Sequence, residues 1–252
     1  MDGEYIDSMF RNLIQRAIKG AVAAVPSQCA VCKTWPAMPV CEACVMHFAQ
    51  PQPRCHTCAL PVTGGVTQCG QCVTSPPPLD TCIAAVSYAY PWAGLITSYK
   101  FNNNPGLAST FATLLRSTPW IEPALERADL IVPMPLSAQR LQSRGFNQAL
   151  LLARELSTDL PAGPDGSSKA DPRLLLRIKD TPPQSSLDRT QRLASVRDAF
   201  AVDPLRADAL KGKRVVLMDD VMTSGASLFA AANILRQAGA AHITAIVIAR
   251  TE

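Results

Sequence analysis

The sequence predicts an α/β protein whose mostly parallel sheet is flanked by helices and preceded by a small cysteine-rich module. In the second part of the chain, short apolar runs rich in β-branched residues alternate with helical stretches, a pattern typical of a parallel sheet. In the first part, cysteine pairs crowd residues 29–72, where hydrophobic periodicity is weak. The length of 252 residues suits one medium domain and an accessory module.

Three segments follow along the chain. Residues 1–25 are predicted to contain an amphipathic helix, because Ile6, Phe10, Leu13, Ile14, Ala17 and Ile18 share one helical face. We expect this face to pack on the protein itself; a membrane surface or a partner is the alternative. Residues 26–78 form the cysteine-rich module, ending in a Pro-rich linker. Residues 79–252 form the α/β domain.

Four Cys-x-x-Cys pairs give the module its chemistry. Each pair places two thiolates on one tight turn, and two pairs complete the all-sulfur tetrahedral site that structural Zn²⁺ takes. Eight residues separate the first two pairs and ten separate the last two, as in a duplicated zinc ribbon. We predict two zinc ions held by neighbouring pairs, with interleaved pairing as the alternative; the ligands are Cys29, Cys32, Cys41, Cys44, Cys55, Cys58, Cys69 and Cys72.

The remaining cysteine and the nearby histidines fall outside this pattern. Cys82 lies in an expected strand, so we interpret it as a small buried hydrophobic residue. With eight cysteines available, His47 and His56 are not needed as ligands. Zinc ribbons contact nucleic acid or protein, but residues 1–80 are electrically neutral, which makes a scaffold role at least as good an interpretation.

Strand and helix signals place the elements of the α/β domain. Strands are expected at 82–90, 129–134, 214–218 and 243–249. Helices are expected at 107–115, at about 137–157, and in the Ala-rich stretch that ends near Gln237, and residues 161–172 form a loop.

Charge and hydropathy limit the function classes. The net charge of +4 comes from residues 136–197, with ten Lys/Arg against six Asp/Glu, which indicates a local anion-binding surface. No apolar run approaches the roughly 20 residues of a membrane span. Arg11, Arg16 and Lys19 interrupt the apolar residues at the N-terminus, so no signal peptide is predicted. We therefore expect a cytoplasmic protein with reduced thiols.

The segment from Arg214 to Ser227 carries the strongest functional pattern. An apolar strand leads to Asp219 and Asp220, then to a small hydroxylated loop, then to a helix. Backbone N–H groups at such a helix N-terminus bind phosphate, and the two carboxylates accept hydrogen bonds from ribose hydroxyls. Paired acids can also bind a metal, as in a Walker B element, but the chain has no G-x-x-x-x-G-K-[ST] motif. A simple strand-to-helix cap is the remaining alternative.

This segment resembles the phosphoribosyl pyrophosphate (PRPP) motif of type I phosphoribosyltransferases. Val132-Pro-Met-Pro135 is similar to the pyrophosphate loop of the amidophosphoribosyltransferases. The segments 140–148, 181–187 and 196–200, the Tyr99-Lys100-Phe101 element and the paired cysteines resemble the ComF family of competence-associated proteins. Ser224 and Ser227 stand where family members often have Thr, and both keep the hydroxyl.

The resemblance implies a type I phosphoribosyltransferase fold and a role for each matching residue. Asp219 and Asp220 are expected to hold the ribose hydroxyls, and Arg189 and Arg192 to close over the pyrophosphate. Mg²⁺ is expected to bind with PRPP. The remaining binding residues are expected to be Thr223, Ser224, Gly225, Ala226, Ser227, Pro133, Met134, Pro135, Leu136, Arg140, Arg144, Gln184 and Lys100.

Two function hypotheses remain. In the first, the chain is a phosphoribosyltransferase that binds PRPP or ribose 5-phosphate and acts on an acceptor that the sequence does not specify. In the second, it is a non-catalytic protein that handles single-stranded DNA, with other competence proteins, during DNA uptake in natural transformation. Turnover would require Mg²⁺ and the acidic pair, whereas DNA binding would weaken steeply with salt.

Overall fold

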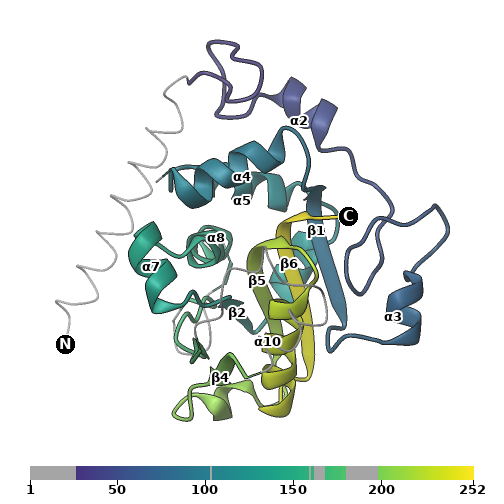
Figure 1. Cartoon of the computed structure of the whole chain (residues 1–252), viewed down its shortest axis with the longest axis vertical. Helices are drawn as coiled ribbons and strands as arrows, with labels where there is room; N and C mark the ends of the chain where they lie inside the picture. Colours follow the sequence, from purple (N-terminus) through teal and green to yellow (C-terminus); the bar gives the residue numbers. More distant parts are fainter. Residues whose placement is uncertain (1–26, 103, 159, 162–167, 180–197) are drawn as a thin grey trace. The chain divides into compact units, whose positions relative to one another are not determined.

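The computed structural model describes residues 27–102, 104–158, 160–161, 168–179 and 198–252 (Figure 1). It divides into two compact units, Met1–His47 and Phe48–Glu252. The first two cysteine pairs lie in the first unit, and the last two lie in the same unit as the sheet. The helix expected at 1–25, together with Gln184, Arg189 and Arg192, lies outside the described residues.

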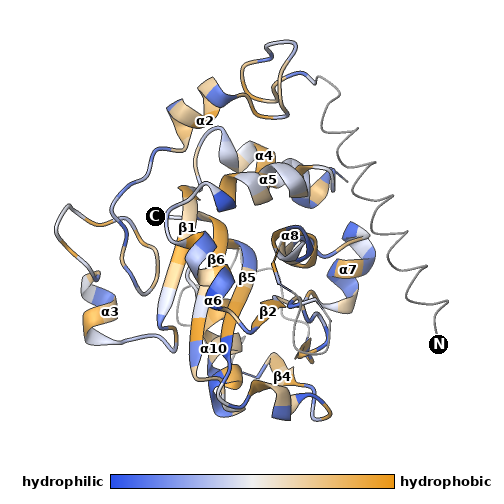
Figure 2. Ribbon diagram, turned by 180° about the vertical axis from the view of Figure 1, so that it is seen from behind, coloured by the Kyte–Doolittle hydropathy of each residue, from blue (hydrophilic) through white to orange (hydrophobic). Residues whose placement is uncertain are grey.

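A four-stranded sheet forms the centre of the second unit, with strand order β1-β6-β5-β2. All its pairings are parallel, as the alternating strand and helix signals predicted. The central strands are apolar along most of their length and carry hydrophobic colours in Figure 2. The strands are β1 (Thr81–Ser87), β2 (Leu130–Pro133), β5 (Arg214–Met222) and β6 (His242–Arg250).

Helices cover both faces of the sheet. Helix α10 (Ala226–Gln237) packs on β5 and β6 from one side, which is the front in Figure 1. The other face is covered by α5 (Leu107–Arg116), α6 (Ile121–Arg127) and α8 (Gln148–Ser157). Leu115, Ile121, Leu125, Leu152 and Leu156 from these helices are fully buried. Burial of these apolar side chains between the helices and the sheet stabilises the sheet, and it thereby fixes the positions of the strand ends.

Local structure departs from the sequence prediction in the expected helix at 137–157. The structure breaks it into α7 (Ala138–Arg144) and α8. Gly145 ends α7 in the left-handed region at φ 77°, and the Asn147 side chain then caps α8 by accepting a hydrogen bond from Leu150 N at 3.2 Å. A glycine cap followed by an Asn cap outweighs the continuous apolar periodicity.

Several elements were not predicted. Helix α4 (Trp92–Phe101) precedes α5, and a short 3₁₀ turn, Ala207–Leu210, precedes β5. A separate antiparallel pair joins β3 (Leu175–Arg177) to β4 (Phe200–Val202). Strands of three residues carry too little alternation to be detected from sequence.

The cysteine-rich segments contain two short helices. Helix α2 (Glu42–Phe48) contains Cys44, the last cysteine of the second pair, and α3 (Gly70–Thr74) contains Cys72, the last cysteine of the fourth pair. Among the described residues, none of the helices is long and apolar enough to cross a membrane.

Candidate functional site

A pocket of about 290 Å³ opens at the carboxyl ends of β2 and β5. Ligands of α/β sheets bind at this edge, because the strand ends and the following loops converge there. The pocket lies entirely within the second unit. Its lining residues are Tyr88, Lys100, Met134, Pro135, Leu136, Arg140, Arg144, Asn147, Gln148, Ala149, Arg177, Asp219, Asp220, Val221, Met222, Thr223, Gly225, Ala226, Ser227 and Leu228.

Two adjacent carboxylates lie on β5 in this pocket. The strand was expected to end at Met218, but its pairing with β6 continues to Met222, so both acids belong to the strand itself. Asp220 is only 7% exposed, and the Lys100 ammonium neutralises it at 2.8 Å. Burial, and then the neighbouring charge of Asp220, raise the pKa of Asp219 to about 7, against the attraction of Lys100. Asp219 can therefore change its charge near neutral pH.

The loop after β5 leads directly into the N-terminus of α10. Gly225 adopts φ 81° and caps the helix, a conformation that strains any other L-residue. A Cβ at this position would lie 2.5 Å from Met222 Cε and 2.6 Å from Phe229 Cζ. Ala226 and Ser227, in the first turn of this 12-residue helix, line the pocket edge, and Ala226 N donates to Ser224 Oγ at 3.4 Å.

The opposite wall follows β2. Its end is aligned with β5, since Met134 N donates to Met218 O at 2.8 Å. The Asn147 side chain holds this turn by donating to Met134 O at 3.0 Å. Arg140 and Arg144 extend from α7 toward the same pocket, and the Arg144 guanidinium stacks 4.7 Å from the Phe101 ring centre. Two arginines thus face two aspartates across one cavity.

Gln148 contributes a side-chain amide nitrogen that has no hydrogen-bond partner among the described residues. The residue is 1% exposed, and its Oε1 accepts a hydrogen bond from Arg144 at 3.2 Å. Its Nε2 is buried and meets no acceptor within the described part of the chain. An unpaired buried donor costs about 1–3 kcal/mol, so a pocket that contains one fits a ligand with acceptor oxygens.

The cysteines of the four Cys-x-x-Cys pairs form two clusters of four. Within each cluster, all sulfur atoms lie within 4.8 Å of one another. Cys29 and Cys44 sulfurs are 3.9 Å apart, those of Cys32 and Cys41 3.6 Å apart, and those of Cys58 and Cys69 3.7 Å apart. Tetrahedral zinc with Zn–S bonds of about 2.3 Å requires sulfur separations of about 3.8 Å. Neighbouring pairs therefore share each cluster, as predicted, and the donor sets fit structural zinc.

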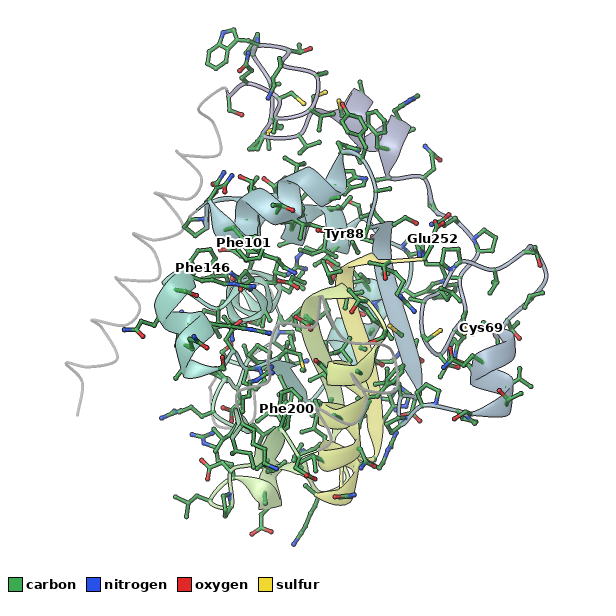
Figure 3. All side chains as sticks on the ribbon, viewed as in Figure 1. Cys69, Tyr88, Phe101, Phe146, Phe200 and Glu252 are labelled. Carbon is green, nitrogen blue, oxygen red and sulfur yellow. The ribbon has the colours of Figure 1, made fainter. Side chains whose placement is uncertain are left out.

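Most of the residues singled out in the sequence come together at the pocket. Pro133 and Ser224 are described but are not among its lining residues. Cys82 is buried, at 4% exposed, as expected. The lining residues that sequence reasoning missed include Tyr88, Asn147, Gln148 and Arg177; Tyr88 follows β1 directly and is labelled in Figure 3. The Asn-Gln pair that starts α8 had a detectable signal, namely an N-cap residue before an apolar run.

Comparison with known proteins decides the family. The phosphoribosyl transferase domain family matches residues 143–252. Competence protein F of Haemophilus influenzae is 30% identical over 203 residues, which cover 79% of this chain and 85% of that protein. The chain belongs to the ComF family.

Other members show how far the similarity extends. DNA utilization protein YhgH of Escherichia coli K12 is 29% identical over 238 residues, which cover 90% of this chain and 98% of that protein. Competence protein ComFC of Bacillus subtilis is 29% identical over 157 residues, covering 62% of this chain and 58% of that protein. The match to YhgH covers most of the length of both chains, so the ComF resemblance is not confined to the phosphoribosyl motif. The phosphoribosyltransferase-type domain and the two four-cysteine clusters are the architecture that this family predicted.

Proposed function

We propose that the pocket of the Phe48–Glu252 unit binds PRPP with Mg²⁺ and that the chain transfers the phosphoribosyl group to an acceptor. One observation carries the proposal. A pair of carboxylates and the N-terminus of a 12-residue helix line the same pocket and are joined by only a short loop, Thr223–Gly225. Their presence in one pocket suits a ribose with a phosphate on its 5-carbon.

The loop and helix supply the phosphate end of the site. Backbone N–H groups and the positive end of the helix dipole stabilise a dianion without a bound cation. The Thr223 and Ser227 hydroxyls add donors. Asp219 and Asp220 supply acceptors for the 2- and 3-hydroxyls, and Lys100 forms an ion pair with the buried Asp220 at 2.8 Å.

The wall formed by α7 supplies the pyrophosphate end. Arg140 and Arg144 present guanidinium groups, which bind phosphate oxygens in a bidentate manner. The unpaired Gln148 Nε2 gives a further donor. Arg189, Arg192 and Gln184 stay predicted contributors from the sequence, as a segment that closes over the pyrophosphate.

Group transfer replaces one bond at ribose carbon 1. The acceptor's lone pair forms the new bond there while pyrophosphate departs with the electron pair of the broken C–O bond. Bound Mg²⁺ supplies charge neutralisation to the leaving group. The chain's own residues fix the ribose by its phosphate and hydroxyls, and its arginines stabilise the growing negative charge.

The relatives' names extend the proposal to a biological setting. Two relatives are named competence proteins, and others are named DNA utilization proteins. We propose a cytoplasmic role in handling internalised DNA, with two Zn²⁺ ions stabilising the cysteine clusters. A non-catalytic single-stranded DNA binder is the second candidate, because Arg140, Arg144 and Arg177 line one pocket with the aromatic Tyr88.

Calorimetric titration with Mg²⁺–PRPP tests the site. Asp219→Asn/Asp220→Asn should weaken binding by about a hundredfold, because neutral amides replace the two charged acceptors. Asp208→Asn is the matched control, since this acid pairs with Lys211 on the surface and is not among the pocket-lining residues. A folded wild-type chain that does not bind PRPP would exclude the proposal. Salt-sensitive binding of a single-stranded oligonucleotide would then favour the second candidate.

A further inference from the structure

One buried side chain, Arg250, joins two parts of the Phe48–Glu252 unit. One part is the second cysteine cluster, formed by Cys55, Cys58, Cys69 and Cys72, and the other is the loop at residues 223–225 between β5 and α10, called the phosphate loop below. This residue is the last of β6 and is 8% exposed. Its Nε donates to Cys58 O at 3.0 Å, and its Nη1 donates to Met222 O at 3.2 Å. The same nitrogen also donates to Thr223 O. A single guanidinium therefore links the backbone of a predicted zinc ligand to the first residue of the phosphate loop.

These contacts set the direction of loop N–H groups. The C=O and N–H of a trans peptide point in opposite directions. Carbonyls held by Arg250 therefore turn the N–H groups of Thr223 and Ser224 away from its guanidinium. Thr251 N donates to Met222 O at 3.1 Å and reinforces the first of these orientations. A loop that binds phosphate through its backbone requires this kind of preset peptide orientation.

The cluster side of the link is packed into the same unit. Cys55, Cys58 and Cys72 are buried, and Cys69, which is labelled in Figure 3, is 9% exposed. His56 O accepts from Cys82 N on β1 at 2.8 Å, and the Cys82 sulfur lies 3.6 Å from the Met222 sulfur. Two routes, one through Arg250 and one through Cys82, thus connect the cluster to the end of β5.

The first cluster offers a natural comparison. Its ligands Cys29, Cys32, Cys41 and Cys44 belong to the other compact unit, and Cys32 is exposed. The structure describes the Arg250 hydrogen bonds only toward the second cluster's segment and toward the strand and loop ends. Loss of metal from the two clusters therefore has different expected consequences.

We propose that Arg250 is a positioning residue for the phosphate loop, and that metal occupancy of the cluster Cys55, Cys58, Cys69 and Cys72 controls phosphate binding through it. The proposal rests on the proposed function, because it assigns the loop to the phosphate of a phosphorylated ribose. It adds a regulatory connection: a thiol-bound metal outside the pocket sets the donor geometry inside it. Loss of metal at this cluster lowers the affinity for phosphate without any change in a pocket residue.

Three variants separate this connection from a general loss of stability. Arg250→Lys keeps the charge and removes the forked geometry. Cys69→Ser removes one ligand of the second cluster, and Cys41→Ser is its matched control in the first. Each full-length protein is assayed for zinc content, for thermal unfolding, and for binding of ribose 5-phosphate and inorganic pyrophosphate by calorimetry. Hydrogen exchange of the peptide spanning residues 219–228 reports loop order without a ligand.

A selective effect on the phosphate end is expected. Arg250→Lys should retain zinc and weaken ribose 5-phosphate binding about tenfold, while pyrophosphate affinity changes less than about twofold. Cys69→Ser should give the same selectivity and faster exchange at 219–228, whereas Cys41→Ser should give neither.

Two results would overturn the proposal. One is equal loss of affinity for both ligands in Arg250→Lys, and the other is equal behaviour of the Cys69→Ser and Cys41→Ser proteins. If Cys69→Ser does not fold, Arg250→Lys with full zinc content decides the question. A wild-type chain that binds neither ligand contradicts the proposed function, and the exchange rates then still decide whether cluster and loop are coupled.

Discussion

Asp219 is a residue whose pKa depends strongly on its surroundings. It lies on β5 beside Asp220, and burial together with that neighbour raises its pKa to about 7 from the ordinary value of 3.8. Since the folded state then binds a proton more tightly than the unfolded state, the stability contribution of Asp219 is fully present below about pH 3.8 and is lost as the pH rises through about 7. Ionisation of Asp219, which the proposed binding of a ribose hydroxyl requires, therefore lowers the stability of the folded state.

We predict that ribose 5-phosphate affinity rises with pH between 5.5 and 8. Below the pKa of Asp219, affinity should change by up to about tenfold per pH unit, because the ionised form accepts the sugar hydroxyl. Calorimetry at a series of pH values measures this, with inorganic phosphate as the control for the ligand's own titration. Asp219→Asn should abolish the part of the pH dependence that is seen for ribose 5-phosphate but not for inorganic phosphate. An unchanged profile in that variant would refute the assignment.

At the scale of single elements, the turn from β5 into α10 depends on one glycine. Gly225 combines a positive φ with close neighbours, whereas Gly212 has φ 71° and no atom within 4 Å of the position that a Cβ would take. The two glycines therefore separate backbone strain from steric conflict. The strain alone costs about 1–2 kcal/mol for an L-residue.

We predict that Gly225→Ala lowers both stability and phosphate binding, while Gly212→Ala lowers stability alone. The methyl group added at position 225 must displace the side chains of Met222 and Phe229, and this displacement moves the loop that precedes α10. Thermal unfolding should show a loss of about 2–4 kcal/mol for Gly225→Ala and about 1 kcal/mol for Gly212→Ala. Ribose 5-phosphate affinity should fall at least tenfold in the first variant only. Equal affinities in the two variants would mean that the loop does not bind the phosphate.

The elements that the sequence predicted are those with strong local signals. The four strands of the parallel sheet and helices α5 and α10 follow from apolar runs and helical periodicity. The extension of β5 to Met222 depends on pairing with Arg250 of β6, a partner distant in sequence. The break at Gly145 and the three-residue strands β3 and β4 also escaped prediction, since caps and long-range pairing outweigh periodicity there.

At the scale of the whole molecule, the site combines parts from distant segments. The motif around Asp219, the turn after β2 and the arginines of α7 were all recognisable by type. The sequence did not reveal three other features, because each depends on tertiary packing. These are the ion pair of Lys100 with Asp220, the unpaired Nε2 of Gln148 and the hydrogen bond from Arg250 to Cys58 O. The local sequence therefore predicts the chemical groups of a site more completely than it predicts the packing contacts that position them.

Contacts made by residues 48–78 bear on where the ligand-binding domain begins. The sequence predicted a boundary at residues 78–79, after both zinc ribbons, whereas the compact unit of the sheet begins at Phe48. In that unit, Cys58 O accepts from buried Arg250 and His56 O accepts from Cys82 N. A fragment 79–252 leaves these donors without partners, whereas a fragment 48–252 keeps them.

We therefore expect the fragment 48–252 to bind one zinc ion and to bind ribose 5-phosphate within about threefold of the full chain. The fragment 79–252 should be less stable by about 2–5 kcal/mol, because a buried guanidinium loses its acceptor and apolar surface of β1 becomes exposed. Urea unfolding, zinc analysis and calorimetry on both fragments measure these quantities. Equal stability and affinity would assign the second cluster to a separable module and would also remove the structural basis for control of the phosphate loop by that cluster.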